Sequence, residues 1–325
     1  MPVSGLNEAP RFSVIIPVYN EAEVIATLVG EIQDVLVGEN ANFELILVDD
    51  GSNDNTRSII SELAAADSRI KIIEFIRNYG QTAALTAGFD YARAEVVVTL
   101  DGDGQNDPAD IPKLLEKLAE GSDAVYGWRR VRKDSALSRR FPSALANWLI
   151  GAVSGVKIHD YGCTLKAFRS PLIRRMQLYG EMHRFIPLYV EWLGGHAVEI
   201  EVHHRPRVKG KSKYGLGRVP KVLLDLMVAI FLHRYLAKPI YVFGGFGLLC
   251  LLASTGFALW AVYLKIFEGA SFILTPLPLL TVTTGLMGVM SLLVGLLAEV
   301  LVRSYHEGLD KRVYTVRSTE NIPVA

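Results

Sequence analysis

The chain has 325 residues, of which 50% are hydrophobic, and it carries 34 basic and 34 acidic residues. A chain of this length can bury a full core, so the surplus apolar surface must lie against something other than water. The two cysteines, Cys163 and Cys250, lie far apart in sequence, which argues against a disulfide framework or a zinc cluster and fits a reducing compartment.

Four continuously apolar segments predict buried strands, at residues 12–18, 43–52, 70–76 and 95–103. Helical stretches separate them. The first helix is predicted to open with a capping box of Asn20 and Glu23, and its inward face carries Val24, Leu28, Ile32 and Val35. The second helix is predicted to end near Ala66, and an alanine-rich third helix follows Arg77. Uniformly apolar strands that alternate with helices predict a parallel sheet covered on both faces.

Polar motifs follow each predicted strand, at residues 19–21, 49–52, 77–81 and 101–105. Ligands of parallel α/β sheets bind outside the carboxyl ends of the strands, so we expect the site there. The chain contains no G-x-G-x-x-G at the first helix and no G-x-x-x-x-G-K-[ST] at any position. Their absence from the sequence argues against dinucleotide-dependent and P-loop chemistry.

The stretch LDGDGQNDP, residues 100–108, places three carboxylates behind the fourth strand. Asp107 precedes Pro108 and a helix-forming run, so a helix N-cap explains it better than catalysis does. Asp101 and Asp103 can converge only if something offsets their repulsion. A hard cation such as Mg²⁺ does so, with carboxylate oxygens and the Gln105 amide oxygen as ligands. The pattern therefore indicates a metal–diphosphate site.

Two segments concentrate positive charge. Residues 129–140 hold six basic residues and one acid, and residues 205–221 hold seven basic residues and no acid. Such segments bind an anionic partner, with a solvated surface as the alternative. Because apolar segments follow closely in sequence, anionic lipid is favoured. A nucleic-acid binder is disfavoured, since no binding motif accompanies the basic residues.

Two uncharged stretches, residues 239–264 and 269–298, are each long enough to cross a bilayer as a helix, which takes about 20 residues. We predict membrane spans at 239–264 and 276–298, with buried core helices as the alternative. Basic residues flank the pair, and the connecting loop offers only Lys265 against Glu268, so both flanks are expected in the cytoplasm. The polar N-terminus shows no signal-peptide core, which agrees with this orientation.

Residues 215–236 predict an amphipathic helix in the headgroup plane, because Arg218, Lys221 and Asp225 share one face. Residues 142–153 fit an interfacial helix and an ordinary core helix equally well. Small residues in the first span permit close helix contacts and leave a homo-oligomer open: Gly244, Gly245 and Gly247.

Six motifs follow one another along the chain: VIIPVYNE (14–21), LVDDGSNDNT (47–56), RNYGQTAALTAG (77–88), DGDGQ (101–105), DYGCTLKAFR (160–169) and RVKGKSKY (207–214). In this order, and followed by two spans, they resemble the polyprenyl-phosphate glycosyltransferases of family 2 over nearly the whole chain. That family includes dolichyl-phosphate mannose synthases and bacterial undecaprenyl-phosphate glucosyltransferases. At one position the chain departs from it, since Gly104 stands where much of the family has an apolar residue.

The resemblance implies an α/β GT-A fold, a nucleotide-sugar donor, Mg²⁺ or Mn²⁺, and a lipid-phosphate acceptor. By matching position it implies nucleotide contacts at Pro17, Tyr19, Glu21, Asp50, Arg77, Asp101 and Gly102. The implied metal ligands are Asp101, Asp103 and Gln105. The acceptor phosphate is assigned to Arg129, Arg139, Ser143, Ser212 and Lys213. The candidate catalytic residues are Asp103, Asp160 and Arg207, of which Arg207 clamps the donor phosphate and Asp160 orients a substrate or holds a turn.

The expected organisation is a catalytic domain at 1–214, an interfacial helix at 215–236, two spans within 237–303 and a cytoplasmic tail at 304–325. The chain is thus expected to be an integral protein of the cytoplasmic membrane. The ionised lipid phosphate can attack the sugar without a strong general base, so direct displacement with inversion is expected. UDP-glucose and undecaprenyl phosphate are the first choice of substrates, and a GDP-mannose-dependent mannose synthase is the alternative.

Two other functions fit the sequence less well. A processive polysaccharide synthase would bring a Q-x-x-R-W element, which the sequence does not contain. A catalytically silent membrane scaffold would have no need of Asp101, Asp103 and Arg207, which are all present.

Overall fold

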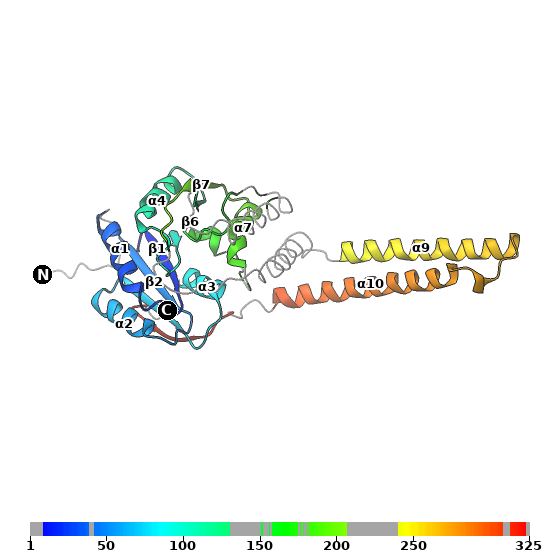
Figure 1. Cartoon of the computed structure of the whole chain (residues 1–325), viewed down its shortest axis with the longest axis horizontal. Coiled ribbons are helices and arrows are strands. Elements are labelled where there is room, and N and C mark those ends of the chain that lie inside the picture. The colour runs from blue at the N-terminus through cyan, green and yellow to red at the C-terminus, as the bar shows by residue number, and fades with distance from the viewer. Residues whose placement is uncertain are drawn as a thin grey trace. The chain divides into compact units, whose positions relative to one another are not determined.

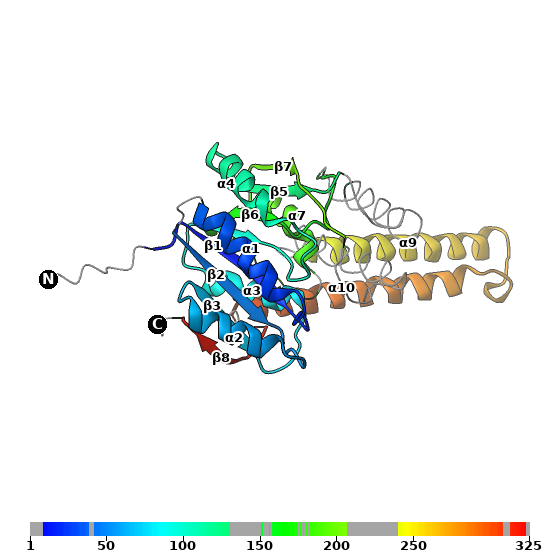
Figure 2. The ribbon, with the colours of Figure 1, turned by 60° about the vertical axis from the view of Figure 1, so that its left-hand side comes forward.

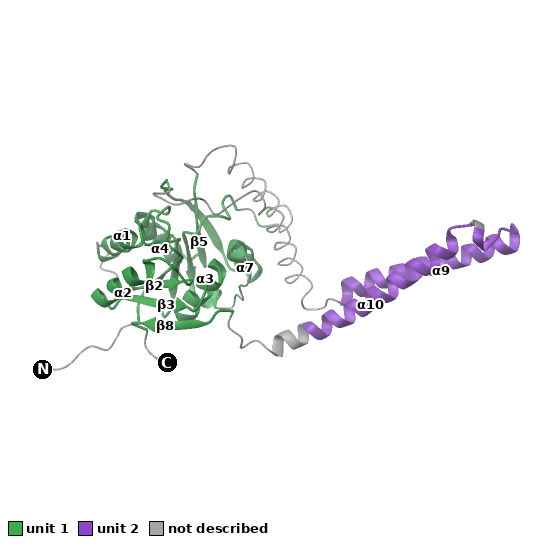
Figure 3. Cartoon of the chain, turned by 60° about the horizontal axis from the view of Figure 1, so that its bottom comes forward, with its two compact units in different colours: residues 1–227, 312–325 green, residues 228–311 purple. Residues whose placement is uncertain are grey.

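The structure is a computed structural model of the full chain. It describes residues 9–38, 42–130, 151, 156, 158–174, 176, 178, 180, 182–206, 240–307 and 313–322. The chain divides into two compact units, which Figure 3 shows in separate colours: residues 1–227 with 312–325, and residues 228–311.

The first unit is built on a sheet with the strand order β7-β5-β6-β4-β1-β2-β3-β8. Its centre consists of four strands that pair in parallel: β1 (Phe12–Val18), β2 (Phe43–Asp49), β3 (Ile70–Phe75) and β4 (Val96–Thr99). These are the four strands that the apolar segments predict. The chain places β2 on one side of β1 and β4 on the other, so the strand order reverses between β1 and β4.

Helices cover both faces of these strands, which explains why the strands are mostly apolar. Val14 and Ile16 of β1 face a core that includes side chains of α1 (Ile25–Gly38), α2 (Thr56–Ala66) and α4 (Ile111–Ala119). Ile15 points the other way, where Gly88 of α3 (Gln81–Tyr91) lies against it. Figure 2 looks onto the face that α1 and α2 cover.

The predicted capping box at the first helix is wrong. Asn20 has a left-handed backbone, with φ of 57°, and its side-chain oxygen accepts from the Asn53 amide at 2.9 Å. The helix begins later, at Ile25, and Glu21 O accepts from the amides of Val24 and Ile25. Asn20 therefore joins the loops after β1 and β2 instead of capping a helix.

The rest of the sheet is mixed. Strand β6 (Lys166–Arg169) runs antiparallel between β4 and β5 (Ala124–Trp128), and β7 (Ala197–Glu201) pairs in parallel with β5. Short helices connect them: η1 (Pro108–Asp110), α6 (Ser170–Ile173), η3 (Met182–Phe185) and α7 (Ile186–Trp192). The unit is thus an α/β sheet domain with a parallel centre, in agreement with the predicted fold class.

A final strand closes the other edge of the sheet. β8 (Val316–Glu320) pairs antiparallel with β3. Ser61 of α2 donates to Glu320 at 2.8 Å, and the Asn321 side chain donates to Ala64 O and Ile70 O at 2.7 and 2.9 Å. This corrects the expectation of a tail at 304–325, because part of that segment completes the sheet.

The second unit is a pair of long helices, α9 (Ile240–Phe267) and α10 (Leu277–Glu307), joined through η4 (Phe272–Leu274) (Figure 1). They begin one residue after the starts of the predicted spans, 239–264 and 276–298, and extend beyond the predicted C-terminal ends. A side chain at Gly247 would lie 2.8 Å from Gly288 O, so the two backbones approach closely there.

The surface of this pair is apolar and largely uncovered. Only 11% of the most hydropathic window of each helix is buried, which is unlike the core helices of a water-soluble domain. Both helices exceed the roughly 20 residues that cross a bilayer. Both helices are therefore long and apolar enough to cross a membrane, in agreement with the prediction of two spans.

The predicted interfacial helix at 215–236 and the ambiguous segment at 142–153 lie outside the described residues, apart from Gly151.

Candidate active site

The predicted nucleotide and metal residues meet at the carboxyl edge of the parallel strands. Pro17 lies near the end of β1, Asp50 directly follows β2, and Asp101 lies two residues after β4. The strand order reverses between β1 and β4, and the crevice at such a reversal is the usual ligand site of open α/β sheets. The fold therefore places the acidic loop where a ligand binds.

Asp101 accepts a hydrogen bond and is repelled by a second carboxylate, Asp103. Asp101 Oδ1 accepts a hydrogen bond of 2.6 Å from the Gln81 side chain at the start of α3. Burial first, and repulsion from Asp103 second, raise the pKa of Asp101 to about 7. Asp103 folds back through its own loop, because its Oδ1 accepts from the Gln105 amide at 3.1 Å. The two carboxylates thus repel each other at the edge of the sheet.

Two glycines allow the acidic loop to take this path. A side chain at Gly102 would lie 2.9 Å from Val18 and 3.0 Å from Pro17 O, so the loop passes tightly over the end of β1. Gly104 has φ of 71°, a left-handed conformation that favours glycine. The departure from the family at Gly104 therefore matches the turn that the backbone makes there.

Asp50 holds the neighbouring loop in place. Its two carboxylate oxygens accept from the amides of Tyr79 and Gly80, at 2.6 and 2.9 Å. Burial raises its pKa to about 6, although these two hydrogen bonds act in the opposite direction. Arg77 of the same loop is exposed, and its guanidinium carbon lies 4.4 Å from the centre of the Tyr79 ring. The carboxylate predicted to contact the nucleotide thus also positions Arg77 and its neighbours.

The remaining residues of the first motif lie beside these loops. Tyr19 and Glu21 are half-buried, and the Glu21 amide donates to the Thr56 hydroxyl at 2.9 Å. The Asn20 amide donates to Ser52 Oγ at 3.0 Å. The loops after β1 and β2 are therefore joined into one wall of the site.

Arg129 and Asp160 form a buried ion pair. Arg129 Nε donates to Asp160 Oδ2 at 2.8 Å, and Nη2 donates to Oδ1 at 3.1 Å. The side chains are 15% and 1% exposed. Asp160 Oδ1 also accepts from the Gly162 amide at 3.2 Å, so Asp160 holds a turn, which is one of the two roles considered for it. Sequence reasoning did not predict this pair.

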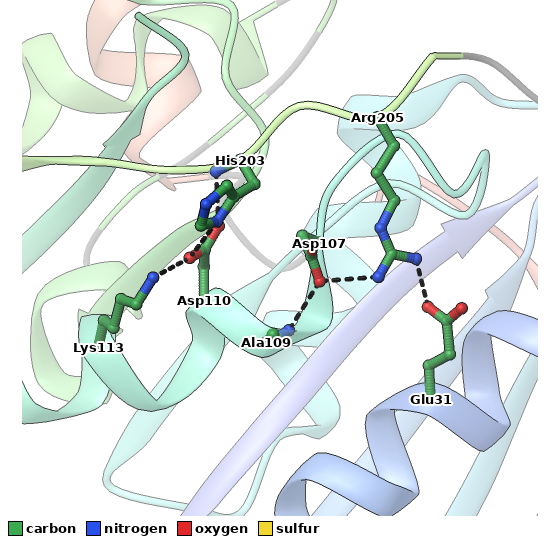
Figure 4. Close-up of polar contacts among 7 residues, drawn as sticks. All are labelled: Glu31, Asp107, Ala109, Asp110, Lys113, His203 and Arg205. Atoms are coloured by element: carbon green, nitrogen blue, oxygen red, sulfur yellow. Dashed lines mark hydrogen bonds and ion pairs between the residues drawn. The ribbon is translucent and has the colours of Figure 1, made fainter. Parts of the chain in front are cut away.

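A second polar network anchors the chain that leads toward Arg207 (Figure 4). Asp107 accepts from the Ala109 amide at 3.1 Å, which confirms it as an N-cap with Pro108 at N1. Asp107 also accepts from Arg205 Nη2 at 2.8 Å, and Arg205 Nη1 donates to Glu31 at 2.5 Å.

The same network continues along the segment. His203 N donates to Asp110 at 2.6 Å, and Lys113 donates to the other oxygen of that carboxylate, also at 2.6 Å (Figure 4). The Arg205 amide donates to Gln105 O at 2.9 Å. The segment that precedes Arg207 is therefore fastened to the acidic loop. Arg205 was missed from the sequence, although its position just before the last motif was a signal.

Comparison with known proteins identifies the family. Residues 13–176, just over half of the chain, match the family model described as "Glycosyl transferase family 2". The chain belongs to glycosyl transferase family 2. The matched segment contains β1 to β6 and the acidic loop.

Two relatives of this glycosyltransferase match almost end to end. The dodecaprenyl-phosphate galacturonate synthase of Rhizobium johnstonii is 38% identical over 97% of this chain and 96% of its own length. The undecaprenyl-phosphate 4-deoxy-4-formamido-L-arabinose transferase of Shewanella sediminis is 36% identical over 94% of this chain and 91% of its own length. The chain is thus a glycosyltransferase that acts in polyprenyl-phosphate sugar transfer, and the silent scaffold is set aside.

Solved structures share the fold of this glycosyltransferase. The glucosyl-3-phosphoglycerate synthase of Mycobacterium tuberculosis, in complex with Mn²⁺, UDP and phosphoglyceric acid, superimposes with a TM-score of 0.53 at 18% identity. The match covers 68% of this chain and 78% of that chain. It confirms the GT-A-like fold that the motifs imply.

Two carboxylates of the glycosyltransferase fit a divalent cation. Among the described residues, no three His, Cys, Asp or Glu side chains converge as metal ligands. Mg²⁺ typically takes one or two carboxylates and completes its shell with water and substrate phosphates. Asp101 and Asp103 supply that number, and the repulsion that raises the pKa of Asp101 is one that a cation relieves.

Five predicted residues of the enzyme lie outside the described part of the chain: Arg139, Ser143, Arg207, Ser212 and Lys213. The described nucleotide and metal residues lie together after strands β1 to β4. Arg129 and Asp160 lie together beside β5.

Proposed function

We propose that this glycosyltransferase transfers the sugar of a nucleotide-sugar donor, bound at the carboxyl edge of the sheet, to the phosphate of a polyprenyl lipid. The observation that carries the proposal is the pair Asp101 and Asp103 on the loop after β4, beside the reversal of strand order. Sugar transfer from such a donor releases a nucleoside diphosphate, and this is the edge at which α/β sheets hold phosphates.

Different residues bind the nucleoside and the diphosphate of the donor. Pro17, Tyr19, Glu21 and Arg77 contact the nucleoside, and Asp50 supports that wall through the loop that it holds. Asp101 and Asp103, with the Gln105 amide oxygen and the backbone of Gly102, hold the diphosphate side. A Mg²⁺ or Mn²⁺ ion bound there supplies positive charge to the departing diphosphate. Arg207 adds a cation to the same phosphates.

The acceptor needs no strong general base, because its phosphate is ionised at neutral pH. A phosphate oxygen of the lipid attacks the anomeric carbon, and the carbon–oxygen bond to the diphosphate breaks, with the electron pair leaving on the nucleotide. The displacement inverts the anomeric centre. Asp160 takes the positioning role, because its pair with Arg129 leaves other guanidinium N–H groups free to face the lipid phosphate. Arg139, Ser143, Ser212 and Lys213 complete the acceptor site.

The return of β8 to the sheet supports the predicted orientation. The chain leaves the catalytic unit before α9 and rejoins it after α10. The segments before and after the helical pair therefore lead into the same domain. With basic residues flanking both helices, we place that domain on the cytoplasmic side. The sugar is then transferred on the inner leaflet.

The donor sugar is the least constrained part. The relatives' names give galacturonate and 4-deoxy-4-formamido-L-arabinose, and neither matches the predicted glucose or the alternative mannose. We therefore widen the donor to a pyranose with a polar or acidic substituent, and keep UDP as the first nucleotide to test.

A donor panel tests the proposal. The purified full-length chain in detergent is incubated with undecaprenyl phosphate and UDP or GDP sugars, with Mg²⁺, with Mn²⁺, or with a chelator. We expect a lipid-linked sugar from one donor, only with metal. The absence of a lipid-linked product from every donor, or full turnover with chelator, would contradict the proposal.

A further inference from the structure

A small pocket is lined in part by Asp101 of the acidic loop. Its polar lining is Thr99, Asp101, Thr164, Lys166 and His183, and Leu85, Leu100 and Ile186 complete it. Thr99 and Leu100 precede Asp101 in the chain, so the pocket reaches below the end of β4. The pocket is partly open and has room for about one water-sized group, which suits a substituent of a sugar and not a whole ring.

Lys166 is the unusual residue of this pocket. It begins β6, where it pairs with Thr99 of β4 and Tyr126 of β5, and it is 4% exposed. Among the described residues, its ammonium group forms no hydrogen bond and has no carboxylate within ion-pair distance. The Asp160 and Asp101 carboxylates act on its charge from beyond ion-pair distance, and the centre of the Tyr126 ring lies 5.9 Å from the ammonium nitrogen. Burial lowers the pKa of Lys166 to about 8, so most molecules keep the charge at neutral pH.

A buried charge without a partner is costly, and proteins pair such groups or neutralise them. Arg129 shows the ordinary solution, since Asp160 binds it bidentately. Asp101 lines the same pocket as Lys166, but it lies beyond ion-pair distance and is the proposed metal ligand. A ligand carboxylate in the pocket would give Lys166 the direct ion pair that neither Asp101 nor Asp160 makes with it.

The walls of the pocket are held rigidly. The Thr99 hydroxyl donates to Thr164 O at 2.8 Å, and the Asn106 side chain donates to the Thr164 hydroxyl at 2.8 Å. On the other side, His183 Nδ1 lies 2.8 Å from the Thr82 hydroxyl. A preorganised wall of this kind favours recognition of one group in one orientation.

We propose that Lys166 binds a carboxylate carried by the donor sugar, so that the enzyme uses a nucleotide-linked uronic acid. This rests on the proposed function. The diphosphate is the other anion at hand, but it is expected at the acidic loop, above the pocket. Of the two sugars named for the relatives, galacturonate carries a carboxylate, whereas a formamido-arabinose carries no anionic group.

Two donors that differ only at C6 test the inference: UDP-galacturonate and UDP-galactose. The full-length enzyme, in detergent with Mg²⁺ and undecaprenyl phosphate, is assayed for kcat/KM with each. Binding of each donor is also measured by displacement of labelled UDP. We expect the wild type to favour the uronate by about 10²-fold, the range of a buried charge-assisted contact. Lys166→Met is expected to reduce that ratio to near one, and Lys166→Arg to restore part of it.

Lys117→Met is the matched control, because Lys117 lies on the surface of α4 and pairs with Glu120. It should leave the ratio unchanged. A wild type that favours galactose, or that binds neither donor, overturns the inference. So does a Lys166→Met enzyme in which both donors weaken equally, since Lys166 then serves the diphosphate or the fold. A preference in binding without any sugar transfer supports the pocket and contradicts the proposed function, so the two failures are distinguishable.

Discussion

The carboxyl edge of the sheet has an acidic half and a cationic half. The loops after β2 and β4 supply Asp50 and Asp101, and burial raises the pKa of these carboxyls to about 6 and about 7. The loop after β5 and the start of β6 supply Arg129 and Lys166. Within the cationic half, Asp160 forms an ion pair with Arg129, whereas Lys166 forms no ion pair within the described part of the chain. This difference agrees with the proposal that the acidic half binds a cation and the cationic half binds anions.

The largest effect is expected from breaking the buried ion pair between Arg129 and Asp160. Asp160→Ala leaves Arg129 buried without its partner, and we expect the free energy of unfolding to fall by about 3–5 kcal/mol. Thermal unfolding of the detergent-solubilised chain measures the change. The double variant Arg129→Met/Asp160→Leu is the control, and it should recover most of the loss. An unchanged Tm in Asp160→Ala would mean that the pair carries no stability.

The second largest effect is expected from removing the Asp103 carboxylate in the acidic half. Asp103→Ala should lower kcat by about 10² to 10³, because a preorganised contact to the departing diphosphate is lost. The variant should still insert into the membrane, which fractionation measures. Asp34→Ala, at an exposed position on α1, is the matched control. Full activity of Asp103→Ala without added metal would remove Asp103 from the metal site.

A pH series sharpens the comparison at Asp50. Its pKa is about 6 in the folded state against 3.8 as the reference value, so the folded state holds the proton more tightly. The stability that this contributes is complete below about pH 4 and is lost as the pH rises through 6. Between pH 4 and pH 6, the free energy of unfolding of Asp50→Asn should therefore rise relative to that of the wild type by on the order of 2 kcal/mol. A pH-independent Tm difference would show that Asp50 titrates normally.

The smallest effect lies away from both halves. The Tyr314 hydroxyl donates to Asp90 at 2.7 Å, and its ring stacks on Phe75 at 5.1 Å. Tyr314→Phe removes the hydroxyl that donates to Asp90 and keeps the ring, so we expect the free energy of unfolding to fall by about 1 kcal/mol. The control is the turnover of the same variant, measured alongside Tm. It should stay within about twofold of wild type. A larger fall in turnover would connect this edge to the site.

Sequence patterns predicted the centre of the fold because local and tertiary preferences agree there. The segments of β1 to β4 are mostly apolar, as is typical of strands covered on both faces. Asp107 was assigned correctly for the same reason, since an Asp-Pro pair before a helix is a local signal. At Asn20 the local signal failed, because its side chain satisfies a partner 33 residues away.

The parts of the site that the sequence missed depend on contacts between distant segments. The pairing of Arg129 with Asp160 and of Arg205 with Glu31 spans 31 and 174 residues, which no short motif encodes. Lys166 looks like an ordinary surface lysine in a strand, and only burial in the folded chain marks it. Strand β8 is short and mostly polar, so without β3 beside it nothing in its pattern indicates a strand.

That last strand bears on how the enzyme is assembled. Until residues 316–320 have been synthesised, the outer edge of β3 has no neighbour, and an open edge is a place where chains stick to one another. The ribosome must deliver both hydrophobic helices before it delivers the piece that seals this edge. The catalytic domain can therefore complete its sheet only after both long helices have been synthesised.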